Sequence, residues 1–293
     1  MKLALHLNDF AWPVAPTDYG RILTEIGQSA EAAGFSVIAV MDHVWQHPYA
    51  GDPAEPVLEA YPTLTWLAAA TERAGLLALA TPVSYRSPGM LAKTVTTLDV
   101  LSGGRAWLGL GVGDYEAEAR GLGIPYPSAA ERYELLEETV QICLRMWSGE
   151  HGDDQPFDGK QVHMERALNL PQSPSRPHPP IMIAGSGANK TLPLVARYAD
   201  ACNLRPGPDL PKTLERLRSL CEEAGRDFGQ IVKTAPWRFD VGAKGPGIPA
   251  LLEQLRGFAE LGIDLVVGRV VDDYRISPIE VMGREVVPAV AEF

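Results

Sequence analysis

LDVLSGGRAWLGLGVG, residues 98–113, is the stretch of sequence that decides the fold of this chain. Its first residues predict the end of a helix, the Ser-Gly-Gly at 102–104 predicts a turn, and residues 105–110 predict a buried strand. The Gly-Val-Gly at 111–113 can form a loop that approaches a ligand closely, because glycine has no side chain. A helix, a short apolar strand and a glycine-rich exit make up one repeat of an α/β fold. Ligands of such folds bind beyond the carboxyl ends of the strands.

The same alternation of apolar strand and amphipathic helix runs through the rest of the chain. Runs such as SVIAVM at 36–41 are typical of strands that are buried on both faces of a parallel sheet. The predicted strands lie at 3–7, 36–41, 76–80, 105–110, 181–184, 201–204, within 231–241, and at 265–270. The main helices are predicted at 19–33, 61–74, 88–101, 128–146, 190–199, 210–224, 248–261 and 278–293. Gly34 should end the first of these helices, and Ser128 with Glu131 should form a capping box.

Eight strand–helix units in 293 residues predict an α/β fold of the (β/α)8 barrel type, as a single domain over residues 1–293. An open doubly wound sheet is the alternative. Its usual GxGxxG after the first strand is absent, since NDFAWP follows there. Residues 149–180 are rich in proline, glycine and polar residues, with a short hairpin expected at 161–166. We expect this segment to be an insertion that lies against the barrel before the fifth strand.

Charge and composition argue against several classes of function. The chain has 26 Lys and Arg against 37 Asp and Glu, and its net charge of −11 disfavours general nucleic-acid binding. No apolar run reaches the length of a membrane span, and MKLALHLNDF fits a core strand better than a secretion signal. Three widely spaced cysteines predict neither a disulfide framework nor a zinc site. We therefore expect a cytoplasmic protein with no nucleic-acid or membrane partner.

Asp42 and His43 close the second predicted strand, within VIAVMDHVW. Ionisable residues at the mouth of a barrel are placed to act on a ligand, and histidine can transfer a proton near neutral pH. In the functional interpretation His43 therefore moves a proton. In the structural interpretation Asp42 caps the loop and His43 makes an ordinary hydrogen bond. The sequence leaves both interpretations open.

Two neighbouring strand ends supply rigid and small residues. Thr81-Pro82-Val83 closes the third strand, where proline cannot donate a hydrogen bond and strand pairing should stop or bulge. A simple strand end is the alternative interpretation of this segment. Gly111 and Gly113 close the fourth strand and allow the backbone to approach a flat ligand, with Asp114 adding an acceptor.

Gly185, Ser186 and Gly187 close the fifth strand and precede a helix that contains Lys190. The N–H groups at the start of a helix can bind an anion, and barrels often hold phosphate at their later strands. We expect a phosphate site here, with a flexible turn as the alternative. No spacing of histidines and acids indicates a metal site.

Several blocks of the chain together resemble the luciferase-like monooxygenase superfamily. They are VMDHVWQ at 40–46, LEAYPTLTWLAA at 58–69, and the long block from TERAGLL to LGLGVG at 71–113. RYELLEETVQICLRMWSG at 132–149 and PPIMIAGSGANKTLPLVARYADACNL at 179–204 continue the match. Within the superfamily the chain looks most similar to probable oxidoreductases that depend on coenzyme F420, a 5-deazaflavin.

The resemblance implies a (β/α)8 barrel whose deazaflavin ring lies at the carboxyl-terminal mouth. It implies that His43 is the proton-transferring residue, and that Pro82-Val83 forms a bulge with a non-prolyl cis peptide under the ring. The cofactor-binding residues implied are Asp42, Pro82, Val83, Gly111, Gly113, Asp114, Gly185, Ser186 and Gly187. Many relatives have Glu, Trp or Asn where this chain has Asp114-Tyr115. The resemblance also matches Glu118 to a common helix acid, for which a structural role is expected.

Three functions are consistent with this resemblance. The first is hydride transfer between C5 of coenzyme F420 and a small organic substrate, in which the protein holds the ring, excludes water and manages one proton. The second keeps the fold and uses FMN in a two-component monooxygenase. The third is a flavin-binding protein without turnover. Superfamily relatives are often dimers, so a homodimer is also expected.

Overall fold

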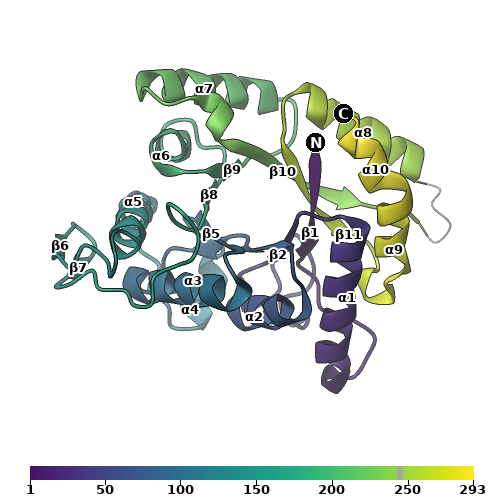
Figure 1. The fold of residues 1–293 in the computed structure, drawn as a ribbon, viewed down its shortest axis with the longest axis horizontal. Coiled ribbons are helices and arrows are strands. Elements are labelled where there is room, and N and C mark those ends of the chain that lie inside the picture. The colour runs from purple at the N-terminus through teal and green to yellow at the C-terminus, as the bar shows by residue number, and fades with distance from the viewer. Residues whose placement is uncertain (243–246) are drawn as a thin grey trace.

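The computed structural model of this protein describes residues 1–242 and 247–293. Within these residues the main sheet is a ring of parallel strands, and apart from β3 and β4 each strand is followed by a helix before the next strand of the ring begins (Figure 1). Its strands are β1 (Lys2–Leu7), β2 (Val37–Val40), β3 (Gly75–Ala78), β4 (Thr81–Pro82), β5 (Ala106–Gly111), β8 (Ile181–Ala184), β9 (Ala201–Asn203), β10 (Val232–Phe239) and β11 (Leu265–Val270). Because β3 and β4 are two pieces of one rung, the ring has the eight positions that the sequence predicts.

The pairing between β3 and β5 closes the ring. The strands follow the order β3-β2-β1-β11-β10-β9-β8-β5, and Leu76 and Leu77 of β3 pair in turn with Ala106 and Trp107 of β5. An open sheet would leave both of these strands as edges. The predicted (β/α)8 barrel is therefore confirmed, and the doubly wound alternative is wrong.

The helices surround this ring, as Figure 1 shows. They are α1 (Tyr19–Ala33), α2 (Ala60–Ala70), α3 (Pro88–Ser102), α4 (Glu116–Gly121), α5 (Ala129–Met146), α6 (Thr191–Tyr198), α7 (Leu210–Glu223), α8 (Ile248–Glu260), α9 (Ser277–Val281), the π-helical turn η4 (Met282–Val286) and α10 (Val287–Ala291). Short 3-10 turns are η1 (Pro16–Asp18), η2 (Phe228–Gln230) and η3 (Asp273–Arg275). No helix among the described residues is long and apolar enough to cross a membrane.

Local signals in the sequence account for several helix ends. Gly34 ends α1 in the left-handed conformation, with a φ of 90°, and its N–H donates to the carbonyls of Ala30 and Glu31. At the start of α5, the Ser128 hydroxyl accepts from the Glu131 N–H, and the Glu131 carboxylate accepts from the Ser128 N–H. Both predicted signals are confirmed.

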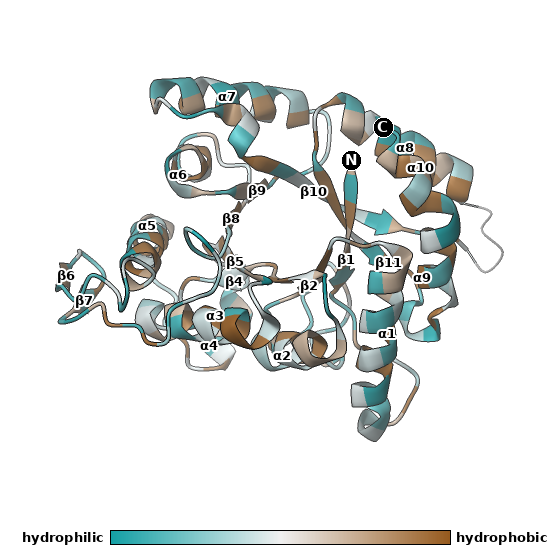
Figure 2. Ribbon diagram, viewed as in Figure 1, coloured by the Kyte–Doolittle hydropathy of each residue, from teal (hydrophilic) through white to brown (hydrophobic). Residues whose placement is uncertain are grey.

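The core has two layers, which follow from the alternation of side chains along each strand. Leu3, Leu5 and Leu7 of β1 pack outward against the helices in the larger apolar cluster. Ala4 points inward and joins a smaller cluster inside the barrel, with Leu77, Met182 and Val267 among its members. Figure 2 shows the resulting pattern, with hydrophobic residues along the strands and hydrophilic ones on the outer faces of the helices. The inner cluster fills the barrel below the carboxyl ends of the strands, so a ligand can enter only above it.

Three details differ from the sequence predictions. The hairpin between α5 and β8 pairs β6 (Phe157–Asp158) with β7 (His163–Met164), a few residues earlier than predicted. The closing helix is interrupted by the π-helical turn η4. The third strand breaks after Ala78, and the non-prolyl cis peptide lies between Leu79 and Ala80 instead of at Pro82-Val83. The predicted position of this bulge is therefore wrong by three residues.

Candidate active site

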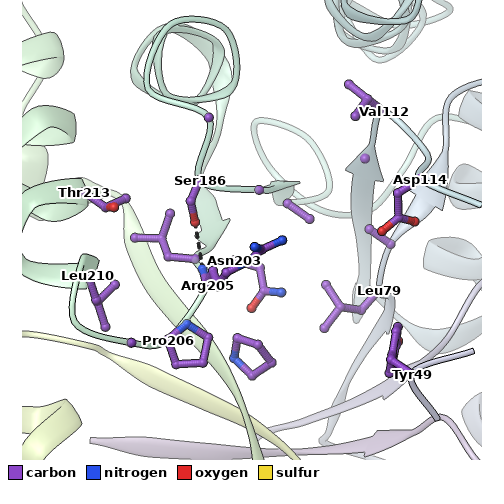
Figure 3. Close-up of a pocket in the computed structure, with 18 of the residues that line it drawn as sticks. Tyr49, Leu79, Val112, Asp114, Ser186, Asn203, Arg205, Pro206, Leu210 and Thr213 are labelled. Carbon is purple, nitrogen blue, oxygen red and sulfur yellow. Dashed lines mark hydrogen bonds between the residues drawn. The ribbon is translucent and has the colours of Figure 1, made fainter. Parts of the chain in front are cut away.

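A cavity of about 1030 Å³ opens at the carboxyl ends of the strands. Its wall includes residues that follow β1, β2, β5, β8 and β9, together with the β3–β4 segment and β10. Figure 3 shows Ser186 and Arg205 on one side of this cavity and Leu79, Asp114 and Tyr49 on the other. Segments far apart in the sequence meet here because parallel strands all end at the same rim of the barrel.

His43 lies on the cavity wall and is held from behind by Glu118 of α4. The His43 Nδ1 and Glu118 Oε2 atoms are 2.7 Å apart, and the Glu118 side chain is fully buried. A carboxylate at Nδ1 fixes the orientation and tautomer of an imidazole and stabilises its protonated form. This geometry suits a histidine that moves a proton.

Glu118 is held as an anion by several donors at once. Its Oε1 accepts from the backbone N–H groups of Val44 and Trp45 at 2.6 and 2.8 Å, and Tyr85 donates its hydroxyl hydrogen to Oε2. Burial opposes ionisation, but hydrogen bonds from His43, Trp45 and Tyr85 outweigh it and lower the pKa of Glu118. Glu118 therefore ties the loop after β2 to helix α4 and presents a negative charge to His43.

Asp42, the neighbour of His43, faces a different partner. It is 3% exposed and accepts from Arg86 at 2.6 and 3.0 Å and from the Thr81 hydroxyl at 2.7 Å. Arg86 also pairs with Glu59, the N-cap residue of α2. Asp42 is not among the residues that line the cavity. Its contacts are those of a structural ion pair, and cofactor binding by Asp42 stays a prediction.

The segment after β3 forms an apolar part of the cavity wall. Leu79, Ala80 and Pro82 line the cavity, whereas Val83 is 1% exposed and packs in the outer core. Val83 instead supports the wall from behind, where its N–H donates to the Gly111 carbonyl. Of the predicted pair Pro82-Val83, only the proline borders the cavity.

Gly111 and Gly113 lie on the cavity wall, as does Asp114. Gly113 has a φ of 76°, and a Cβ added there would lie 3.2 Å from the Pro82 Cβ. A side chain would therefore crowd the apolar wall, and glycine keeps this wall flat. A flat apolar surface suits one face of a flavin or deazaflavin ring.

Asp114 stands near His47 as well as His43. Its Oδ1 is 3.7 Å from the His47 Nε2, and one ligand atom from each of His43, His47 and Asp114 lies within 4.8 Å of the others. Burial and the neighbouring His43 lower the pKa of His47. These three side chains could hold a divalent metal ion.

Gly185, Ser186 and Gly187 border the cavity. Figure 3 shows Ser186 beside Arg205, on the side opposite Asp114. The Ser186 hydroxyl accepts from the Arg205 N–H at 2.8 Å, and the Gly185 N–H donates to the Asn203 carbonyl at 2.9 Å. A Cβ at Gly187 would come within 3.0 Å of the Thr191 hydroxyl at the start of α6. The Arg205 charge and this narrow glycine loop fit a phosphate group.

The flat wall and the glycine loop together fit a cofactor that carries a flat ring and a phosphate. Two buried polar atoms at the cavity, His6 Nε2 and Asn8 Oδ1, have no hydrogen-bond partner among the described residues. Sequence reasoning missed the roles of Tyr85, Arg86 and His6. For His6 a signal existed, because a histidine stands in the apolar alternation of LALHL.

Comparison with known proteins identifies the family. The profile of the luciferase-like monooxygenase family matches residues 4–249, so the chain belongs to this family of enzymes, as the resemblance implied. An F420-dependent glucose-6-phosphate dehydrogenase of Tsukamurella paurometabola is 32% identical over 226 residues, which cover 73% of this chain and 62% of that protein. An uncharacterized protein of Mycobacterium tuberculosis is 29% identical over 267 residues, covering 86% of this chain and 88% of the relative. The chain thus spans only about three fifths of the length of the dehydrogenases that it matches.

Solved structures share the fold at lower identity. An F420-dependent secondary alcohol dehydrogenase in complex with an F420–acetone adduct superposes with a TM-score of 0.80 at 18% identity, over 99% of this chain and 98% of the other. The monooxygenase RslO1 of Streptomyces bottropensis gives a TM-score of 0.78 at 18% identity, over 98% and 99% of the two chains. These likenesses establish the barrel fold.

Proposed function

We propose that this protein is an oxidoreductase that transfers a hydride between coenzyme F420 and a small organic substrate. The observation that carries the proposal is the His43–Glu118 pair on the wall of a cavity that fits a flat ring and a phosphate. Its choice of cofactor is supported by the curated relatives, which are F420-dependent dehydrogenases at 30% and 32% identity. When bound, a deazaflavin supplies hydride chemistry at its C5 atom.

In this proposal the chain's own residues position the reactants and move one proton. Leu79, Ala80 and Pro82, which line the cavity, would hold the ring on one side and exclude water there. Ser186 and Arg205 would hold the phosphate on the opposite side of the cavity. Holding the cofactor at these two places would orient it with respect to the substrate.

His43 exchanges the proton that accompanies hydride transfer. When a hydroxyl group is oxidised, its proton passes to the exposed nitrogen of His43, and Glu118 stabilises the imidazolium that forms. In the direction of carbonyl reduction, His43 returns this proton to the oxygen. Glu118 acts through His43 and is a positioning residue.

An FMN-dependent monooxygenase is the second candidate. The phosphate site and flat wall would serve FMN as well, and monooxygenases such as RslO1 share this fold. The curated relatives favour F420, because those at 30% and 32% identity are F420-dependent dehydrogenases, whereas RslO1 at 18% identity shares the fold alone.

Titrating the purified protein with F420 and with FMN, and following the fluorescence of each cofactor, tests the choice between them. We expect tight binding of F420 and weak binding of FMN. Arg205→Gln should weaken F420 binding about tenfold, as expected for the loss of one charged hydrogen bond. Arg238→Gln, which alters an exposed side chain paired with Asp240, serves as the control.

Tight FMN binding with weak F420 binding would contradict the proposal, and oxygen consumption with a flavin reductase would become the next assay. Binding of neither cofactor would remove both candidates. If F420 binds, its absorbance in the presence of secondary alcohols, or that of its reduced form with ketones, reports turnover. His43→Ala should abolish such turnover, and unchanged turnover would remove the role assigned to His43.

A further inference from the structure

His6 is a buried histidine whose Nε2 atom has no hydrogen-bond partner in the part of the chain that the structure describes. It lies in β1, is 8% exposed, and lines the floor of the cavity. Two residues on, Asn8 also lines the cavity, and its Oδ1 is likewise buried without a partner. Buried polar atoms are nearly always hydrogen-bonded, and an unsatisfied one destabilises the folded protein. Two such atoms from residues that line the same cavity indicate a polar ligand there.

Strand alternation places these two residues on one face. Leu5 and Leu7 point outward into the helical layer, so His6 and Asn8 point into the barrel. Ala4 lies one step below His6 on the same face, within the inner apolar cluster. His6 is therefore the first polar side chain of β1 above the inner apolar cluster that fills the barrel.

The neighbours of this pair hold it in place. The Asn8 carbonyl accepts from the fully buried Gln46 side chain at 3.2 Å. Burial lowers the pKa of His6 to about 4, with a hydrogen bond to the Leu79 backbone opposing the shift and Arg269 adding to it. The His6 ring is thus neutral at pH 7. A neutral imidazole has one N–H and one lone pair, and with its N–H at Nδ1 the Nε2 atom offers its lone pair to the cavity.

The position of His6 in the ring separates it from the phosphate site. In the order of the eight rungs, β1 lies directly across the barrel from β8, whose carboxyl end carries Gly185, Ser186 and Gly187. A cofactor anchored by its phosphate beyond β8 leaves the floor beside β1 to the other reactant. With the His6 N–H at Nδ1, the Nε2 lone pair and the Asn8 oxygen are both acceptors, and the group that they recognise is a hydrogen-bond donor.

We propose that His6 and Asn8 form a subsite that binds a hydroxyl group of the substrate, whose single hydrogen is shared between Nε2 and Oδ1. This inference rests on the proposed function for the statement that the ligand is a substrate, and it makes that substrate an alcohol or polyol. His6 and Asn8 are binding residues in it, and proton transfer stays with His43.

The test uses the full-length protein with ¹⁵N-labelled histidine, in which NMR reports each ring nitrogen. Cyclohexanol and cyclohexanone are the probes, because they share a ring and only the alcohol donates a hydrogen bond. His6→Phe assigns the His6 signals, and His163, which is exposed in the β6–β7 hairpin, is the internal control. With F420 present, we expect cyclohexanol to shift the Nε2 signal of His6, and neither probe to shift those of His163.

An equal response of His6 to both probes, or a response to neither, would overturn the inference. If F420 does not bind, the same titration without cofactor still measures whether cyclohexanol reaches His6. Failure of the inference about His6 and Asn8 can therefore be distinguished from failure of the proposed function. Asn8→Ala should weaken cyclohexanol binding about three- to tenfold, as expected for one hydrogen bond. It should leave F420 affinity unchanged. A loss of F420 affinity would mean that the donor belongs to the cofactor, which would also overturn the inference.

The melting temperature of the ligand-free His6→Phe variant gives a second readout. Phenylalanine keeps the ring and removes the unpartnered nitrogen, so the variant should melt no lower than the wild type. A histidine with a merely structural role predicts a lower melting temperature. His163→Phe, the same substitution at an exposed position, is the matched control.

Discussion

Replacing Asp42 by asparagine separates a structural role from a role in ligand binding. Asp42 is 3% exposed and accepts three hydrogen bonds, two of them from Arg86, whose side chain is 19% exposed. Asparagine keeps one acceptor oxygen but loses the charge, so Arg86 keeps only Glu59 as an anionic partner. Breaking a buried pair from one side costs about 3–5 kcal/mol. Because Glu59 remains, we expect a loss of about 3 kcal/mol.

The assay is chemical unfolding of the wild type and the variant, with heat unfolding as a check. A loss of this size should lower the melting temperature by roughly 6 °C or more. Glu116→Gln is the matched control, since Glu116 pairs at 2.7 Å with Arg120 but both side chains are more than half exposed. A pair of this kind contributes about 0.5 kcal/mol or less.

The cofactor affinity of the same variant decides between the two interpretations of Asp42. Because Asp42 does not line the cavity, F420 affinity should change by no more than about twofold. Undiminished stability together with a large loss of F420 affinity would refute the structural account. A double-mutant cycle with Arg86→Met should give a coupling energy close to the single-mutant loss.

Three further predictions concern the rest of the site. Glu118→Gln should slow turnover about tenfold or more, as expected for the loss of one charge-assisted hydrogen bond. Because the folded protein lowers the pKa of Glu118, the stabilising charge of this residue is present above pH 4.5. The difference in unfolding free energy between wild type and variant should therefore shrink as the pH falls below that value. His6 binds a proton in the unfolded chain below pH 6.5, but in the folded protein only near pH 4. The wild type should therefore lose up to about 3 kcal/mol of stability as the pH falls from 6.5 to 4, and His6→Phe should abolish this loss. Burial raises the pKa of Asp273 to about 7, so Asp273 makes the folded protein more stable as the pH falls through the same range. This contribution is common to both proteins. The measured quantity is therefore the difference in unfolding free energy between wild type and variant at each pH. Zn²⁺ should bind at His43, His47 and Asp114 and inhibit turnover. Calorimetry with ZnCl₂ should show this binding in the wild type and its loss in His47→Gln. Equal binding by both proteins would refute the site.

The sequence by itself determined the elements and their order. Apolar runs such as 36–41 and the amphipathic segment 19–33 depend on local periodicity, which survives any tertiary arrangement. Helix signals such as Gly34 and Ser128 act within one turn of the chain, and both were predicted correctly. Eight alternating units leave few topologies for the chain, so the closed barrel also followed. The cavity at the strand ends followed in turn, because parallel strands end at one rim.

Only the tertiary structure decided which polar groups meet at that rim. Glu118 lies 75 residues from His43, and no local pattern predicts that its carboxylate would reach the imidazole. Asp42 and His43 are neighbours on the chain, yet the backbone directs Asp42 to Arg86 and His43 to the cavity. The position of the cis peptide depended on how the third rung fits its neighbours, which moved it to Leu79-Ala80. Such pairings depend on side-chain directions across strands and helices, and these directions become fixed only when the barrel closes.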